Sequence, residues 1–460
     1  MPQKGFDEAQ PKDIALMAHL MRRAGFGATR DELEAYVARG YEATVEELLH
    51  PGDDAYLGKD VVDRYYIDID DMRQADSIAG WWLYRMINSR GPLQEKMALF
   101  WHGLFATAYE KVQNGRATAA QVQMFRRHWL GDFPTILLEL SRDPAMVIWL
   151  DNNTNHKGAP NENYGRELLE LFSMGVGNYT EEDVKDCARA FTGWTIAPFI
   201  ARYPWGAFPF EFEFRPDDHD DSEKGFLGHT GRYDGQEVID LIVRQPATGR
   251  FIANKLYHFF VSDDPPPEAA IKTLSDVYFQ SHYDLRSVMR VLLNADFFKD
   301  ARFAKVKSPV ELVAGVLRLV GDFREPKPGL TAMSWEAKYM GQELLNPPTV
   351  EGWHTGKEWI DSGALVGRVN FAADQVGNLD QSGVQAIIQR LSARGSSLSP
   401  EALVDGCLDL IGPLEVLPET RSALVAKARG KGSAEDEADF ARRVGEMLQL
   451  IVATREYQFA

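Results

Sequence analysis

The sequence predicts a mainly α-helical protein, a globular bundle of many helices with one small β-hairpin insertion near residues 195–230. Apolar residues recur at helical spacing through most of the 460 residues. A period of two occurs in one stretch, at the aromatic residues Phe208, Phe210, Phe212 and Phe214. Strands and helices do not alternate along the chain, and this argues against a Rossmann fold or a barrel.

Capping residues and glycines indicate where the first helices begin and end. Residues 13–23 carry apolar side chains at helical spacing, and Gly25 ends that helix. Thr29 and Glu32 form a capping-box pattern that starts a second helix, because each side chain can bond the backbone N–H of the other residue. A third helix over 43–49 stops before a proline. Three short helices so close together predict a compact N-terminal bundle.

Further helices are predicted on both sides of the hairpin. Before it, helical patterns cover 77–90, 92–112, 121–130, 133–141 and 144–150. After it, they cover 236–244, 247–261, 268–279, 285–294 and 310–320, and a Pro- and Gly-rich loop precedes the last helices. We expect two parts: an all-α domain with the hairpin insertion over 1–370, and a C-terminal helical extension over 371–460 packed on it.

Composition narrows the classes of function. The 50 basic and 68 acidic residues give a formal net charge of −18, which repels nucleic acid and anionic lipid at long range. No run reaches the roughly 20 apolar residues of a membrane span, and the start of the sequence lacks the pattern of a secretory signal. We therefore expect no nucleic acid partner, no membrane insertion, and a cytoplasmic location unless a partner carries the protein out. Cys187 and Cys407 are expected to be buried thiols.

The stretch 151–194 holds the densest group of polar residues. A predicted helix there carries two neighbouring polar stripes, made of Glu162, Arg166 and Glu170 with Asn163 and Glu167 beside them. An amide-rich loop that includes Asn161 leads into the helix N-terminus, a favourable place for an anion. One interpretation is a solvated face with ordinary ion pairs. In the other, Glu167 or Glu170 is a general base or ligand, Arg166 orients a carboxylate or binds an anionic substrate, and Asn161, Glu162 and Asn163 bind substrate.

Three further groups are candidates. Carboxylates crowd around His219, and oxygen ligands on a loop suit a hard divalent cation, so His219 and Asp220 are candidate metal ligands; the alternative is an acidic surface turn. His102, among aromatic residues, is either a catalytic acid or metal ligand or an ordinary buried histidine. Trp353 and His354 lie on the Pro- and Gly-rich loop, where they could stack on a sugar or aromatic ligand or close the core beneath the loop.

Several blocks of the sequence occur in a recognisable order: HLMRRAGFGATRDELEAYVARG, EKMALFWHGLFAT, the long block from SRDPAMVIW to RAFTGW, HDDSEKGFLGHTG, VKSPVEL and NPPTVEGW. Together they resemble the uncharacterised bacterial family called domain of unknown function 1800, over roughly His19 to Phe371. The resemblance implies no established activity. It implies relatives that are typically exported and often encoded beside a sulfatase-like partner. Leu104 stands where many relatives are expected to carry a second histidine.

The leading hypothesis is a hydrolase with a polar cleft and a divalent metal ion as its candidate cofactor. Hydrolysis is preferred because no GxSxG elbow, P-loop or dinucleotide-binding glycine motif occurs, and nothing else indicates an organic redox cofactor. One alternative is a non-catalytic scaffold or an accessory subunit of a sulfatase-like partner. Another is a protein that binds a glycan or an aromatic compound.

Overall fold

The protein is mainly α-helical with two small antiparallel sheets, which confirms the predicted fold class. The computed structural model describes residues 11–52, 74–197, 210–395, 398–430 and 436–460. The chain begins with three helices, α1 (Pro11–Arg23), α2 (Arg30–Arg39) and α3 (Tyr41–Leu49). The capping box predicted for α2 is present, because Thr29 N–H donates to Glu32 Oε2 at 2.7 Å and Glu32 N–H donates to Thr29 Oγ1 at 3.4 Å.

The next helices lead to the polar stretch and through it. They are α6 (Ala75–Asn88), α7 (Pro92–Leu104), α8 (Tyr109–Val112), α9 (Gly115–Arg127), α10 (Phe133–Arg142), α11 (Pro144–Trp149), the 3-10 turn η2 (Asn152–Thr154), α12 (Asn163–Glu170) and α13 (Glu181–Ala190). The prediction of one helix over 92–112 is wrong, because the helix breaks into α7 and α8. At the break, Tyr109 N–H donates to the Leu345 carbonyl at 2.8 Å, so a long-range contact replaces a helical one.

The predicted insertion contains two pairs of strands rather than one. Strand β1 (Trp194–Ile196) pairs with β2 (Phe212–Phe214), and β3 (Lys224–Phe226) pairs with β4 (His229–Gly231). A 3-10 turn, η3 (Pro216–Asp218), lies between the two pairs. Phe212 and Phe214 of the alternating aromatic run lie on β2, and Phe208 lies outside the described residues.

Helices fill the rest of the chain. They are α14 (Gly235–Val243), α15 (Pro246–Phe260), α16 (Glu268–Gln280), α17 (Leu285–Asn294), α18 (Asp296–Lys299), α19 (Pro309–Val320), α20 (Leu330–Tyr339), η4 (Gly356–Ile360), α21 (Ser362–Gly377), α22 (Ser382–Ser392), α23 (Pro400–Leu410), α24 (Pro418–Arg429), α25 (Glu437–Val452) and η5 (Glu456–Gln458). A boundary at residue 370 would fall inside α21. Buried apolar residues of α21 to α25 belong to the same continuous core as those of α1.

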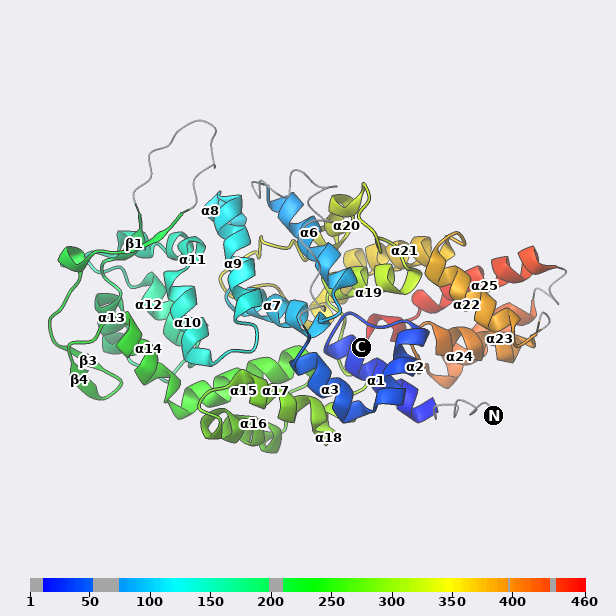
Figure 1. Ribbon diagram of the computed structural model, residues 1–460, viewed down its shortest axis with the longest axis horizontal. Helices are drawn as coiled ribbons and strands as arrows, with labels where there is room; N and C mark the ends of the chain where they lie inside the picture. Colours follow the sequence, from blue (N-terminus) through cyan, green and yellow to red (C-terminus); the bar gives the residue numbers. More distant parts are fainter. Residues whose placement is uncertain (1–10, 53–73, 198–209, 396–397, 431–435) are drawn as a thin grey trace.

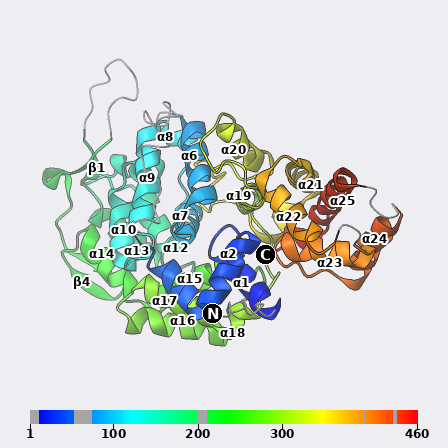
Figure 2. The same ribbon diagram turned by 45° about the vertical axis from the view of Figure 1, so that its right-hand side comes forward.

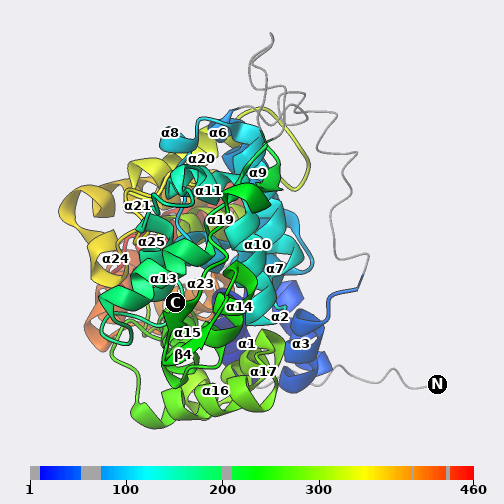
Figure 3. The same cartoon turned by 90° about the vertical axis from the view of Figure 1, so that its left-hand side faces the viewer.

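The helices form an elongated molecule. One end carries α10 to α14 and the strands, and the other carries α22 to α25 (Figure 1). Figure 2 shows the last described residues returning from α25 to lie beside α1 and α2. Figure 3 looks onto the end that carries α13, α14 and β4. In the middle, α19 packs against α6, α20, α21 and α22, so it joins the two ends through one core.

Candidate functional site

The amide-rich loop before α12 holds the protein's own backbone. Asn152 and Asn155, each 2% exposed, donate from Nδ2 to the carbonyls of Trp194 and Ala188, both at 2.8 Å. Asn155 Oδ1 accepts the backbone N–H of Asn161 at 2.9 Å. These amides therefore join the loop to the end of α13 and to β1.

Asn161 is engaged at both ends of its side chain. Its Nδ2 donates to Thr154 Oγ1 at 3.0 Å, and its Oδ1 accepts the backbone N–H of Asn163 at 3.0 Å. The Asn163 side chain is exposed at the first turn of α12. The anion position expected at this helix N-terminus is thus partly occupied by the Asn161 amide oxygen.

Arg166 forms ion pairs on the surface. Its Nη2 lies 2.7 Å from Glu181 Oε2 and 3.1 Å from Glu162 Oε2. The exposed fractions of these side chains are 34% for Arg166, 39% for Glu162 and 68% for Glu181. Exposed pairs of this kind contribute little to stability, because water screens both charges. A substrate anion at Arg166 would have to displace Glu181.

Glu167 differs from its neighbours because it is a half-buried carboxylate to which the described part of the chain gives no hydrogen bond or ion pair. Burial raises its pKa, and the negative charges of Glu170 and Glu351 raise it further, while the positive charge of Arg166 acts in the opposite direction. Glu170 is held in place by Tyr179, whose hydroxyl donates to Glu170 Oε2 at 2.6 Å. Glu351 comes from the loop after α20 and was missed by sequence reasoning, since nothing local connects it to α12.

Lys255 of α15 is the cation on which the charge of Glu351 acts, whereas the cation that acts on Glu167 itself is Arg166. Burial lowers the Lys255 pKa, and the charge of Glu351 acts in the opposite direction. The Lys255 side chain still reaches solvent, so the surrounding protein removes only part of its hydration. Its Nζ lies 5.3 Å from the centroid of the Phe251 ring. Glu351 thus connects Glu167 and Glu170 with Lys255, and we call these four residues the Glu167 group.

His102 lies in the core and apart from that group. It is fully buried, and its Nε2 accepts the backbone N–H of Leu345 at 3.0 Å. The Trp82 and Trp353 rings lie with their centroids 5.5 Å and 5.1 Å from the His102 ring. Burial lowers the His102 pKa to about 3, so the imidazole stays neutral. This placement favours the ordinary buried histidine of the two interpretations.

The loop with Trp353 and His354 is fixed against α7. Gly352 has a φ of +90°, and a Cβ there would lie 2.4 Å from the Gly103 carbonyl oxygen, so only glycine fits. Trp353 packs its ring on His102, whereas His354 is exposed and pairs with Glu358 at 2.6 Å. Trp353 thus closes the core beneath the loop, and the loop carries Glu351 toward α12.

His219 and Asp220 lie together near the end of α13. Asp220 Oδ2 accepts Arg189 Nε at 2.8 Å, and His219 Nδ1 donates to the Thr192 carbonyl at 2.9 Å. Partial burial would raise the Asp220 pKa, but hydrogen bonds from Arg189 and Ser222 outweigh burial and hold the pKa below its usual range. Within the described residues, no three His, Cys, Asp or Glu side chains are grouped so that they could hold a metal ion.

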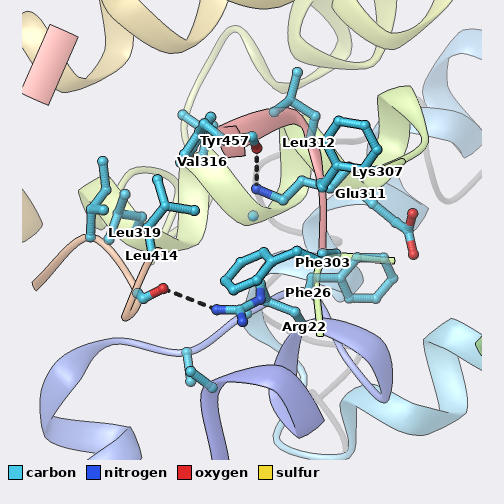
Figure 4. Close-up of a pocket in the computed structure, with 18 residues that line it drawn as sticks. Arg22, Phe26, Phe303, Lys307, Glu311, Leu312, Val316, Leu319, Leu414 and Tyr457 are labelled. Carbon is cyan, nitrogen blue, oxygen red and sulfur yellow. Dashed lines mark hydrogen bonds between the residues drawn. The ribbon is translucent and has the colours of Figure 1, made fainter. Parts of the chain in front are cut away.

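A second polar group lies where sequence reasoning predicted no site. A cavity of about 70 Å³ lies between α1, α19 and the C-terminal segment, and Arg22, Lys307 and Glu311 belong to its wall. Figure 4 shows these three side chains. The sequence blocks HLMRRAGFG and VKSPVEL carry these residues. No spacing rule connects the two blocks, because the fold alone brings α1 beside α19.

The molecule is a mainly α-helical protein with two small sheets and two separate polar groups. None of the helices in the described ranges is long and apolar enough to cross a membrane. The chain belongs to the family described as protein of unknown function (DUF1800), whose model matches residues 19–459. The match continues past Phe371, where the recognisable blocks were expected to end. No curated protein and no solved structure matches the chain.

Proposed function

We propose that the protein is a hydrolase in which Glu167 acts as the general base. The observation that supports this is the half-buried Glu167 carboxylate, which has no hydrogen bond or ion pair in the described part of the chain and faces the like charges of Glu170 and Glu351. Such a carboxylate is unfavourable for folding, and perturbed acids of this kind concentrate at catalytic sites.

The proposed chemistry uses side chains of the Glu167 group. The Glu167 carboxylate takes a proton from a water molecule, and the water oxygen bonds to the electrophilic atom of the substrate. The bond to the leaving group breaks with its electron pair, and the leaving group takes a proton from the Lys255 ammonium. The lowered Lys255 pKa makes this proton easier to release, and the raised Glu167 pKa makes its carboxylate a stronger base.

The expected metal ligands fit a divalent ion poorly. The Asp220 carboxylate is already bonded by Arg189 and Ser222, and the His219 Nδ1 is used by the Thr192 carbonyl. The cation Arg189 beside Asp220 would repel a second positive charge. The proposed reaction therefore assigns no step to His219, Asp220 or a metal ion.

The test is a panel of chromogenic esters, phosphate esters, sulfate esters and glycosides. We expect the wild type to hydrolyse one class, and Glu167→Gln to lower kcat by about 100-fold or more. Glu182→Gln is the matched control, because Glu182 is an exposed glutamate of α13 paired with Lys185. Both variants should unfold at the same temperature as the wild type. Equal rates for Glu167→Gln and wild type, or no hydrolysis of any class, would refute the proposal.

A second candidate function is a non-catalytic accessory subunit of a sulfatase-like partner. It is favoured by the buried amides of Asn152 and Asn155, which are committed to the protein's own backbone. Size-exclusion chromatography of the two proteins mixed would show a stable complex, unchanged by Glu167→Gln. Separate elution of the two proteins would count against this candidate.

A further inference from the structure

The cavity between α1 and α19 is apolar apart from a few charged groups. It is lined by Ala18, Arg22, Phe26, Gly27, Ala28, Phe303, Lys307, Glu311, Leu312, Gly315, Val316, Leu319, Ile411, Gly412, Leu414, Tyr457, Phe459 and Ala460. Its volume of about 70 Å³ is several times the roughly 10–15 Å³ that one water molecule requires. The cavity is partly open to solvent, so it can hold an acidic head group while the apolar part of the acid lies along the wall toward the opening.

The carboxylates near this cavity already have partners. Glu311 Oε1 accepts Lys96 Nζ and lies 3.4 Å from Arg23 Nη1, so one carboxylate serves two cations. Asp263 pairs with Lys305 at 2.6 Å. In Figure 4 the Glu311 carboxylate points away from Arg22 and Lys307. The Glu311 carboxylate is thus paired with Lys96 and Arg23 and not with Arg22 or Lys307.

Three basic side chains near the cavity, Arg22, Lys307 and Arg368, form no ion pair with a carboxylate among the described residues, and burial lowers the pKa of each. Arg22 donates from Nη1 to the Gly412 carbonyl at 3.0 Å, and Lys307 donates to the Tyr457 carbonyl at 2.6 Å. Arg368, fully buried behind Lys307, donates from Nη2 to the Lys307 carbonyl at 2.8 Å. Uncompensated positive charge is costly in a protein interior, because neutral carbonyls replace only part of the lost hydration.

The free edge of the Arg22 guanidinium indicates which chemical group would fit the cavity. Its Nε and Nη2 are both buried, and no atom of the described residues forms a hydrogen bond with them. These two atoms form the side edge of the guanidinium, the edge that matches the two oxygens of a carboxylate or of a phosphate. The Phe303 ring centroid lies 4.7 Å from the Arg22 guanidinium carbon, and both residues line the cavity.

We propose that this cavity binds a small organic acid, with its carboxylate on the Arg22 edge near Lys307 and its apolar part against the side chains of Leu312, Val316 and Leu319. The apolar walls favour an aromatic or aliphatic acid over a bare inorganic anion, because burial of carbon surface adds to the charge attraction. The site is independent of the Glu167 group, which lies on other helices.

The experiment is calorimetric titration of the full chain with phenylacetate, acetate and inorganic phosphate. We expect phenylacetate to bind at least about tenfold more tightly than acetate, and Arg22→Gln to weaken it by about tenfold or more. Arg166→Gln is the matched control, because it removes a guanidinium whose partners are exposed carboxylates. It should leave binding unchanged, and so should Glu167→Gln.

A second variant keeps the test decisive if Arg22→Gln fails to fold. Leu319 is half-buried on the cavity wall, and Leu319→Trp would fill the apolar part while retaining both cations. We expect it to abolish phenylacetate binding. The proposal is overturned by absence of saturable binding of phenylacetate to the wild type, by binding of phosphate alone, or by unchanged phenylacetate binding in Leu319→Trp.

Discussion

The polar face of α12 and the cavity beside α1 use charge in opposite ways. On α12, Arg166 reaches solvent and bonds to two glutamates. In the cavity wall, Arg22 and Lys307 bond only to backbone carbonyls, and the Glu311 carboxylate serves other cations. The first region balances its charges in water, whereas the second leaves positive charges unbalanced in a low-dielectric interior.

This difference shows where polar residues indicate a ligand. A dense polar run in a sequence is compatible with ordinary surface pairing, as at Arg166, because such pairs need no partner molecule. A buried charge without a partner is costly, so it is kept only where something offsets the cost. By this criterion Glu167 is the exception on α12, and Arg22 is the clearest case in the cavity wall.

The largest expected effect comes from removing the shared carboxylate of the second region. Glu311→Gln leaves the Lys96 ammonium and the Arg23 guanidinium without their negative partner in a site where the Glu311 side chain is 5% exposed. We expect the free energy of unfolding to fall by about 3–5 kcal/mol, measured by denaturant titration at neutral pH.

The matched change on the α12 face is Glu181→Gln, which removes the bidentate partner of Arg166. Because this pair is exposed, we expect the denaturant midpoint to stay within experimental error. If the two variants lose similar stability, the contrast between balanced surface charge and buried charge is wrong.

The next effect separates the buried amides from the exposed polar residues within the 151–194 stretch. Asn155→Ala leaves the Asn161 N–H without its partner, and the Ala188 carbonyl keeps only the weaker of its two hydrogen bonds, from the Phe191 N–H at 3.2 Å. We expect a loss of about 1–3 kcal/mol in the free energy of unfolding. Asn163→Ala is the control, because the Asn163 side chain is exposed and alanine retains the backbone N–H that Asn161 accepts. If Asn155→Ala is as stable as the wild type, the Asn155 side chain is not required to hold the loop in place, and a role of this loop in ligand binding becomes the better interpretation.

Local structure could be predicted from the sequence, because helix caps and hydrophobic periodicity depend on residues only a few positions apart. The capping box at Thr29 is an example, and so is the period of two that places Phe212 and Phe214 on β2. The break after Leu104 was not predictable in this way, since the Leu345 carbonyl that accepts the Tyr109 N–H comes from a distant loop.

The candidate sites depended on distant contacts even more. The spacing in α12 identified Glu167, but Glu351 acts on it from the loop fixed at Gly352, and Lys255 of α15 is linked to the group only through Glu351. His102 has a suggestive sequence context, yet the Leu345 N–H and two tryptophan rings determine its role in the core. The cations of the cavity belong to α1, to the segment before α19 and to α21, so no local pattern could join them.

Near neutral pH, the smallest expected effect is a pH dependence in the second region. His19 lies on α1 next to Arg22 and is fully buried, with its Nε2 donating to the Phe298 carbonyl at 2.9 Å. Burial lowers the His19 pKa from 6.5 to about 3, and the charges of Arg22 and Arg23 act in the same direction. Below pH 6.5 the unfolded chain therefore binds a proton that the folded protein refuses. Stability contributed by His19 is complete above that pH and is lost as pH falls toward 3.

His19→Gln tests this directly, because the glutamine amide can still donate to the Phe298 carbonyl but does not titrate. We expect the dependence of unfolding free energy on pH in this window to become shallower by about 1.4 kcal/mol per pH unit. On the α12 face, the hydrogen bond from Arg166 lowers the Glu181 pKa from its usual 4.5, so that carboxylate titrates only at lower pH. Equal slopes for His19→Gln and the wild type would mean that His19 accepts a proton in the folded protein, in which case the positive field around Arg22 must be weaker than the unpaired cations imply.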